Sequence, residues 1–185
     1  PKWKGRLCLR TSKKVYNQSL VATLIARLGE QRAEEVVRGW VDNLAAPPFS
    51  NDTKAMEAVA AGLCDVTIVN TYYFGRLQKD QPDIKLAIFW PNQDSSGVHI
   101  NVSGAGVTRY AKHPEAAQQL LEWLSSEDAQ GDFAGLNLEY PVNPAVGPDP
   151  LVAAWGEFQA DELNVNEAGP LQSEAIMLMD RAGYQ

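Results

Sequence analysis

The sequence has little cysteine, little histidine and no long apolar run. Two cysteines among 185 residues are too few for a disulfide scaffold, and they lack the CxxC spacing of a zinc or thioredoxin-like site. The two histidines, His99 and His113, are expected to be structural, because neither has a second ligand nearby. No run approaches the roughly 20 apolar residues of a transmembrane helix, and the first residues lack a signal-peptide core. We therefore expect no membrane span and a mature or truncated chain.

Positive charge and catalytic motifs are also scarce. The 16 basic side chains are outnumbered by 23 acidic ones, which gives a net charge of −7. This is the wrong sign for a protein that binds phosphate backbones, so no nucleic-acid partner is expected. There is no nucleophile elbow, no HExxH and no Walker loop. The sequence therefore does not predict an enzyme.

Short apolar runs alternate with amphipathic stripes, and this pattern predicts an α/β fold. Residues 6–10 predict a strand, and apolar stripes within 20–28 and 33–44 predict two helices. A third helix is expected after a cap at Asn51 or Asp52. A strand parallel to the first should follow this helix.

The expected parallel strand covers residues 65–70, and further strands are expected later in the chain at 84–90 and 98–102. Pro114 is expected to open a helix. The apolar side chains of that helix should face inward, and they are Ala117, Leu120, Leu121 and Leu124. A last helix is expected near 171–182.

Tyr72 and Tyr73 stand at the carboxyl end of the predicted 65–70 strand, where parallel sheets place ligand groups. A phenol has a reference pKa of about 10, so a phenolate at neutral pH needs strong positive charge, which a metal ion supplies. Neighbouring strand residues point to opposite faces, so both rings can reach one ion only if the backbone turns here. Alternatively, one ring packs in the core and the other lies on the surface.

A set of short segments is spread over nearly the whole chain, at residues 3–12, 16–17, 62–66, 69–73, 101–107, 111–114 and 140–142. In sequence and in order, these segments resemble the ferric-ion-binding periplasmic proteins of bacterial iron(III) ABC importers. The resemblance implies a two-lobed, periplasmic-binding-protein-like α/β fold of type II. It also implies a periplasmic protein that captures Fe(III) and delivers it to an ABC permease in the inner membrane.

The resemblance also implies a ligand set. It is closest to the tyrosine-rich branch, which does not depend on a synergistic anion, and in that branch Tyr72, Tyr73 and Tyr16 bind the ion. Family members are longer, and this chain begins at the motif that usually opens the second lobe. Residues 1–101 and 154–185 are then expected in the second lobe, and 102–153 in a segment that returns to the first. The missing part supplies further ligands, so the site of this chain can be empty. The full-length protein is expected to be a monomer.

Four polar residues near the tyrosines are candidates for supporting the ion or an anion: Arg10, Ser12, Asn70 and Arg76. Arg76 lies about one helical turn after the tyrosine pair and can offset phenolate charge, or it is an ordinary exposed arginine. Arg10 and Ser12 precede the helix of Tyr16. They can hold an anion at its N-terminus, or they form a simple cap or a solvated loop.

Cys8 and Cys64 lie in and directly before the two strands that are expected to be parallel. Neighbouring strands lie about 4.8 Å apart, which is compatible with disulfide geometry. We therefore expect a Cys8–Cys64 disulfide, which indicates an oxidising compartment. Two separate buried thiols are the alternative.

Two other functions stay open. The same fold can bind an organic anion or cation with the tyrosines as a pocket wall, and such a complex lacks iron–phenolate colour. In a different class, the two-lobed fold can carry an effector-sensing or enzymatic domain, because a fold does not decide function. A DNA-binding extension or a catalytic pair would support this reading, and the sequence shows neither.

Overall fold

The computed structural model describes residues 2–185, and their contacts divide into two compact units. The first unit comprises the chain up to Asn70 together with Asp83–Asn101 and Phe158–Gln185. The second comprises Thr71–Pro82 and Val102–Glu157. The expected division differs from these units chiefly at Thr71–Pro82. This segment was expected to group with the rest of residues 1–101, but it belongs to the second unit. The assignment of the units to two lobes stays a prediction.

Two short parallel strands, β1 (Leu7–Cys8) and β2 (Val66–Thr67), lie at the centre of the first unit. Leu7 pairs with Val66 in register, so the predicted parallel pairing is confirmed. Both strands are shorter than the predicted runs of 6–10 and 65–70. Two isolated parallel bridges add to this pairing: Leu7 bridges to Leu44, and Arg10 bridges to Phe49.

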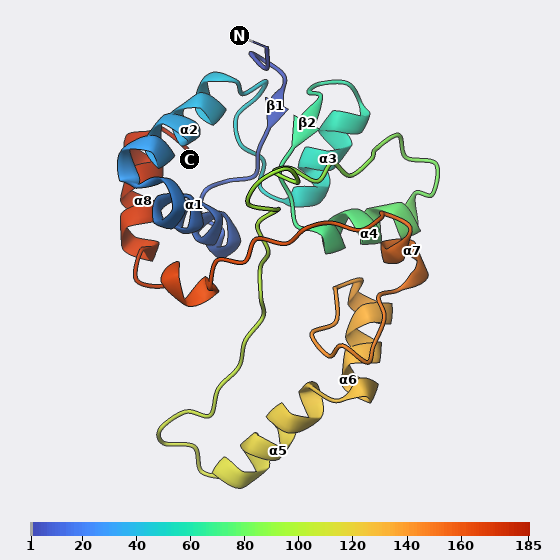
Figure 1. Ribbon diagram of the computed structural model, residues 1–185. Helices are drawn as coiled ribbons and strands as arrows, with labels where there is room; N and C mark the ends of the chain where they lie inside the picture. The colour runs from blue at the N-terminus through green and yellow to red at the C-terminus, as the bar shows by residue number, and fades with distance from the viewer. Residues whose placement is uncertain (1) are drawn as a thin grey trace. The chain divides into compact units, whose positions relative to one another are not determined.

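Four helices flank these strands (Figure 1). They are α1 (Val15–Leu28), α2 (Glu30–Asp42) and α8 (Gln172–Arg181) on one side and α3 (Asp52–Ala60) on the other. A 3₁₀ turn, η2 (Val165–Glu167), precedes α8. The main core joins β1 to α1, α2 and α8. Its members include Leu7, Leu9, Val21, Ile25, Val37, Leu178 and Met179.

Local sequence explains two of the helix ends. Gly29 separates α1 from α2 at a φ of 77°, a conformation that glycine adopts without the steric cost of a side chain. The Asn51 side chain accepts a 2.8 Å hydrogen bond from the Lys54 amide and caps α3. The prediction of a cap at Asn51 or Asp52 is therefore confirmed at Asn51.

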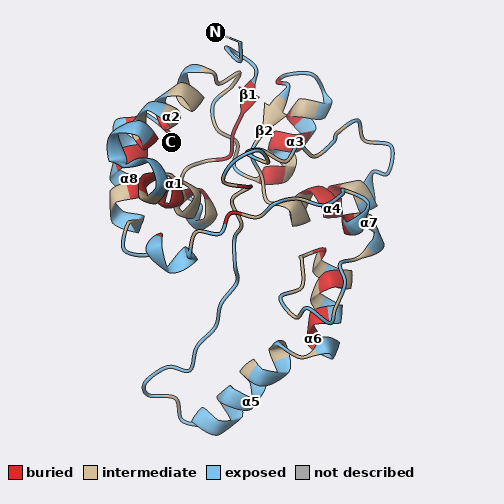
Figure 2. Cartoon of the chain, in the orientation of Figure 1, coloured by how far each residue is buried: buried red, intermediate tan, exposed pale blue. Residues whose placement is uncertain are grey.

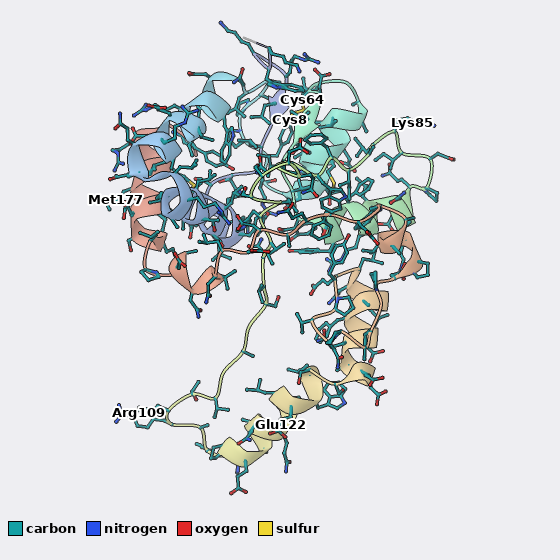
Figure 3. The ribbon with its side chains drawn as sticks, viewed as in Figure 1. Cys8, Cys64, Lys85, Arg109, Glu122 and Met177 are labelled. Carbon is teal, nitrogen blue, oxygen red and sulfur yellow. A yellow bond between two sulfur atoms is a disulfide. The ribbon has the colours of Figure 1, made fainter. Side chains whose placement is uncertain are left out.

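A disulfide joins Cys8 of β1 to Cys64, two residues before β2, and the two Cα atoms lie 5.9 Å apart. Figure 3 shows the two cysteines side by side. Both are buried and pack against Ala58 of α3 in a small second cluster. The predicted pairing is confirmed, because parallel pairing brings β1 and the start of β2 together.

The second unit is helical. It contains α4 (Thr71–Asp80), α5 (Pro114–Leu124), α6 (Glu127–Asp132), the π-helix η1 (Phe133–Asn137) and the short α7 (Pro150–Ala153). Pro114 opens α5 as predicted. The predicted inward face of α5 is wrong, since none of its residues is buried and Leu120 is 54% exposed (Figure 2). Amphipathic spacing is present, but residues 2–185 supply no layer that covers it.

The strands predicted at 84–90 and 98–102 are wrong as well. Residues 84–90 alternate between half-buried and exposed side chains, as a strand does, and Phe89 is 85% exposed. No segment within the described chain pairs with them, and a strand needs a ladder partner. Val98 forms only an isolated bridge with Ala160. None of the helices in residues 2–185 is long and apolar enough to cross a membrane.

Candidate metal centre

Tyr72 and Tyr73 lie in the first turn of α4, which begins directly after Asn70. Their ring centroids are 4.4 Å apart, and the ring planes are tilted by 42°. Helical side chains lean toward the N-terminus of their helix, so neighbouring rings in the first turn can meet there. The change from extended chain to helix is thus the backbone turn that was expected at this point.

One positively charged side chain, that of Arg76, lies against this tyrosine pair. The Arg76 guanidinium lies 5.1 Å from the ring centroid of Tyr72 and 5.8 Å from that of Tyr73. Its Nη2 donates a 3.2 Å hydrogen bond to Oδ1 of Asn137. The N-terminus of a helix also favours negative charge. The exposed Arg76 therefore contacts both tyrosine rings and Asn137, which distinguishes it from an arginine surrounded only by solvent.

Tyr16 lies in the first turn of α1, in the first unit. Its hydroxyl donates a 2.6 Å hydrogen bond to Oδ2 of Asp52. Asp52 has no exposed surface and forms an ion pair with Arg10, which is itself 6% exposed. The Arg10 guanidinium lies 5.5 Å from the ring centroid of Tyr16. A cation and a buried carboxylate therefore hold this phenol.

Arg10 and Ser12 do not cap the helix of Tyr16. The N-cap of α1 is Lys14, without a side-chain cap hydrogen bond. The Arg10 guanidinium pairs with Asp52, and the backbone amide of Ser12 donates a 3.1 Å hydrogen bond to the carbonyl of Gln185. Of the three roles considered, the simple cap is therefore wrong.

Asp52 and Tyr184 complete this cluster, and sequence reasoning missed both. The Tyr184 hydroxyl donates a 2.5 Å hydrogen bond to the backbone carbonyl of Arg10. Burial raises the pKa of Tyr184, so the phenol keeps the proton that it donates. Asp52 was considered only as a helix cap. Because it lies 36 positions after Tyr16, no local motif connects the two.

Asn70 also belongs to the first unit, where its Oδ1 accepts a 2.9 Å hydrogen bond from Nδ2 of Asn101. This contact ties the end of the β2 segment to the 98–101 segment. Across residues 2–185, no group of three or more His, Cys, Asp or Glu side chains could hold a metal ion. The candidate groups that the structure brings together in α4 are the two tyrosine rings.

Comparison with known proteins identifies relatives along the whole chain. Residues 11–160 match the family described as bacterial extracellular solute-binding protein. A relative named iron uptake protein A2, from Synechocystis sp., is 45% identical over 193 residues, a match that covers 100% of this chain and 56% of the relative. The chain therefore spans about half the length of the curated relatives it matches.

Solved structures match as closely. A Trichodesmium protein in complex with iron and citrate ligands has 42% identity and a TM-score of 0.94, covering 100% of this chain and 60% of that one. A ferric binding protein from Campylobacter jejuni has 30% identity and a TM-score of 0.94, with the same coverage of 100% and 60%. The fold expected for the chain, that of a periplasmic-binding-protein-like iron-binding protein, is therefore confirmed.

Proposed function

The chain belongs to the bacterial extracellular solute-binding protein family, and from this premise we propose that the whole protein captures ferric iron and delivers it to an ABC permease. Tyr16, Tyr72 and Tyr73 supply phenolate ligands. The part of the protein beyond this chain supplies the others. The protein acts outside the cytoplasm as a carrier rather than as an enzyme.

The tyrosine pair at the start of α4 is the observation that carries this proposal. Two phenol rings lie next to each other at one helix N-terminus, with the Arg76 guanidinium over both, and a bound ferric ion would supply the positive charge that phenolates need. Fe(III) is a hard ion, and hard anionic oxygen donors favour it over ions that prefer nitrogen or sulfur. The relatives named for iron uptake and ferric iron binding support the same cargo.

Delivery follows from the architecture of the family. Two-lobed binding proteins close on their ligand by a hinge motion, and the closed form is the one presented to a permease. The Cys8–Cys64 disulfide fits this setting, because disulfides persist in oxidising compartments such as the periplasm. We expect the whole protein to act as a monomer in this role.

Titration of the whole protein with ferric citrate, followed by its visible spectrum, tests the proposal. Tyr72→Phe and Tyr73→Phe each remove one ligand oxygen and should abolish the iron–phenolate band. Tyr16→Phe should keep colour but release iron faster to citrate. Tyr110, which is 86% exposed, supplies the matched control, because Tyr110→Phe should leave the band unchanged.

A band of wild-type intensity in both the Tyr72→Phe and Tyr73→Phe proteins would rule out the phenolate ligands. A wild-type protein that binds citrate without colour would instead favour the organic-anion alternative.

A further inference from the structure

Gly75 lies in the middle of α4, two residues after Tyr73, and is buried. A Cβ atom at this position would lie 2.8 Å from Cδ1 and 3.1 Å from Cβ of Leu138, and 3.1 Å from Cη2 of Trp155. These distances are shorter than normal carbon contacts of about 3.5–4.0 Å. The missing side chain of Gly75 therefore lets α4 approach Leu138 and Trp155 closely.

Leu138 has little freedom to give way. It has no exposed surface, and it follows the π-helix η1 in the left-handed conformation, with a φ of 61°. Its amide donates a 3.2 Å hydrogen bond to the carbonyl of Ala134, which ties it back to η1. A leucine in this conformation is unusual and persists only where the surroundings hold it. Residue 138 thus gives α4 a fixed surface.

Other contacts of α4 reach the same surface. Phe74 packs on Trp155 with ring centroids 5.5 Å apart, and the Trp155 indole donates a 3.0 Å hydrogen bond to Gln78. Arg76 donates to Asn137, and Lys79 donates a 3.1 Å hydrogen bond to the carbonyl of Gly135. Successive residues of α4 after the tyrosine pair are therefore fixed to η1, Leu138 and Trp155.

We infer that Leu138, acting through Gly75, is a positioning residue that sets the geometry of the Tyr72–Tyr73 phenol pair. The packing surface formed by η1, Leu138 and Trp155 fixes the position of α4 along its axis and its rotation about that axis. Since both phenols project from the turn directly before Gly75, a clash at Gly75 that bends or rotates this part of α4 moves both phenol oxygens and tilts their rings. This inference rests on the proposed function, because it concerns the same tyrosines.

The test compares Gly75→Ala, Leu138→Gly and the double variant in the whole protein. Gly131→Ala is the matched control, since this helical glycine has no atom within 4 Å of an added Cβ. Leu138→Gly removes two of the three close atoms and suits a positive φ. The readouts are the position of the iron–phenolate band, iron retention against citrate, and the near-ultraviolet circular dichroism of the metal-free protein.

Gly75→Ala should shift the band and lower ferric affinity by about 10- to 100-fold, the usual loss when a residue that orients a metal ligand is changed. The double variant should bring the band back toward its wild-type position, and Gly131→Ala should change nothing. A Gly75→Ala protein that melts earlier but keeps the wild-type band and affinity would overturn the inference, because that is what a purely structural glycine produces. A double variant without recovery would also overturn it.

Two further measurements keep the inference apart from folding and from the proposed function. If Gly75→Ala does not fold, Asn137→Ala provides a second test, because it removes the exposed hydrogen bond from Arg76 of α4 to this packing surface. An unchanged band in that variant would then count against the inference. If wild-type protein shows no iron–phenolate band, the proposed function fails. The metal-free dichroism of the tyrosine pair then still decides the positioning role, which a Gly75→Ala spectrum identical to wild type would refute.

Discussion

The Tyr16 hydroxyl donates a 2.6 Å hydrogen bond to Asp52, a carboxylate with no exposed surface. Arg10, two residues after β1, forms an ion pair with the same carboxylate. The Tyr184 hydroxyl donates a hydrogen bond to the backbone carbonyl of Arg10. A tyrosine of the first helix, an arginine of the sheet region, an aspartate of the third helix and a tyrosine near the C-terminus thus form one cluster. The stability of this cluster depends on the buried ion pair between Arg10 and Asp52.

Asp52→Ala should lower the free energy of unfolding by about 3–5 kcal/mol, because it leaves the Arg10 charge buried without its carboxylate. Urea denaturation measures the loss. Asp65→Ala is the control, since the Arg6–Asp65 pair is about half exposed, with side-chain exposures of 46% and 50%. It should cost at most about 1 kcal/mol. Equal losses in the two variants would show that burial of the Arg10–Asp52 pair has no energetic consequence.

The Cys8–Cys64 disulfide closes a loop with a sequence separation of 56. The chain-entropy description gives about 4 kcal/mol of stabilisation for such a loop. The Cys8→Ser, Cys64→Ser double variant should therefore unfold at a markedly lower urea concentration. Thiol titration of denatured, unreduced protein should detect no free thiol. Two titratable thiols per chain would contradict the bond.

His99 gives a pH dependence with a defined sign. Burial lowers the pKa of His99, against opposing effects of Asn101 and the Asp161 charge. The unfolded chain then binds a proton below about pH 6.5, the ordinary histidine value, while the folded chain does not. Stability should therefore fall as the pH drops from about 6.5 through the lowered folded pKa.

His99→Gln should flatten this part of the stability curve, measured by urea denaturation at a series of pH values. His113→Gln changes the other histidine of the chain, which is exposed at the start of α5, and should leave the curve as in wild type. Identical slopes in the wild-type and His99→Gln proteins would contradict the role of His99.

The 185-residue chain by itself should bind ferric iron much more weakly than the whole protein. The chain spans about half the length of its relatives, and the remaining part is proposed to supply further ligands and to shield the ion from water. Competition with citrate, followed by the visible spectrum of each protein, measures the difference. Equal retention by the two proteins would show that the site is complete within this chain.

Local patterns in the sequence predicted the elements that depend on neighbouring residues. The spacing of apolar residues predicted α1, α2, α3 and α8, Asn51 was a predicted cap, and Pro114 was predicted to open α5. Helices and caps are set by residues within four or five positions of each other. The helix, strand and cysteine order also predicted the parallel β1–β2 pair and the disulfide.

Only the tertiary structure decided which apolar patterns become paired or covered. Residues 84–90 have the alternation of a strand and α5 has an apolar face, but within residues 2–185 the first has no ladder partner and the second no covering layer. The same distinction holds at the candidate site. The sequence determined the chemistry, because two adjacent tyrosines follow an apolar strand. The fold decided their surroundings, since Asp52 lies far along the chain from Tyr16 and Leu138 lies far from Gly75, and only packing brings such residues into contact.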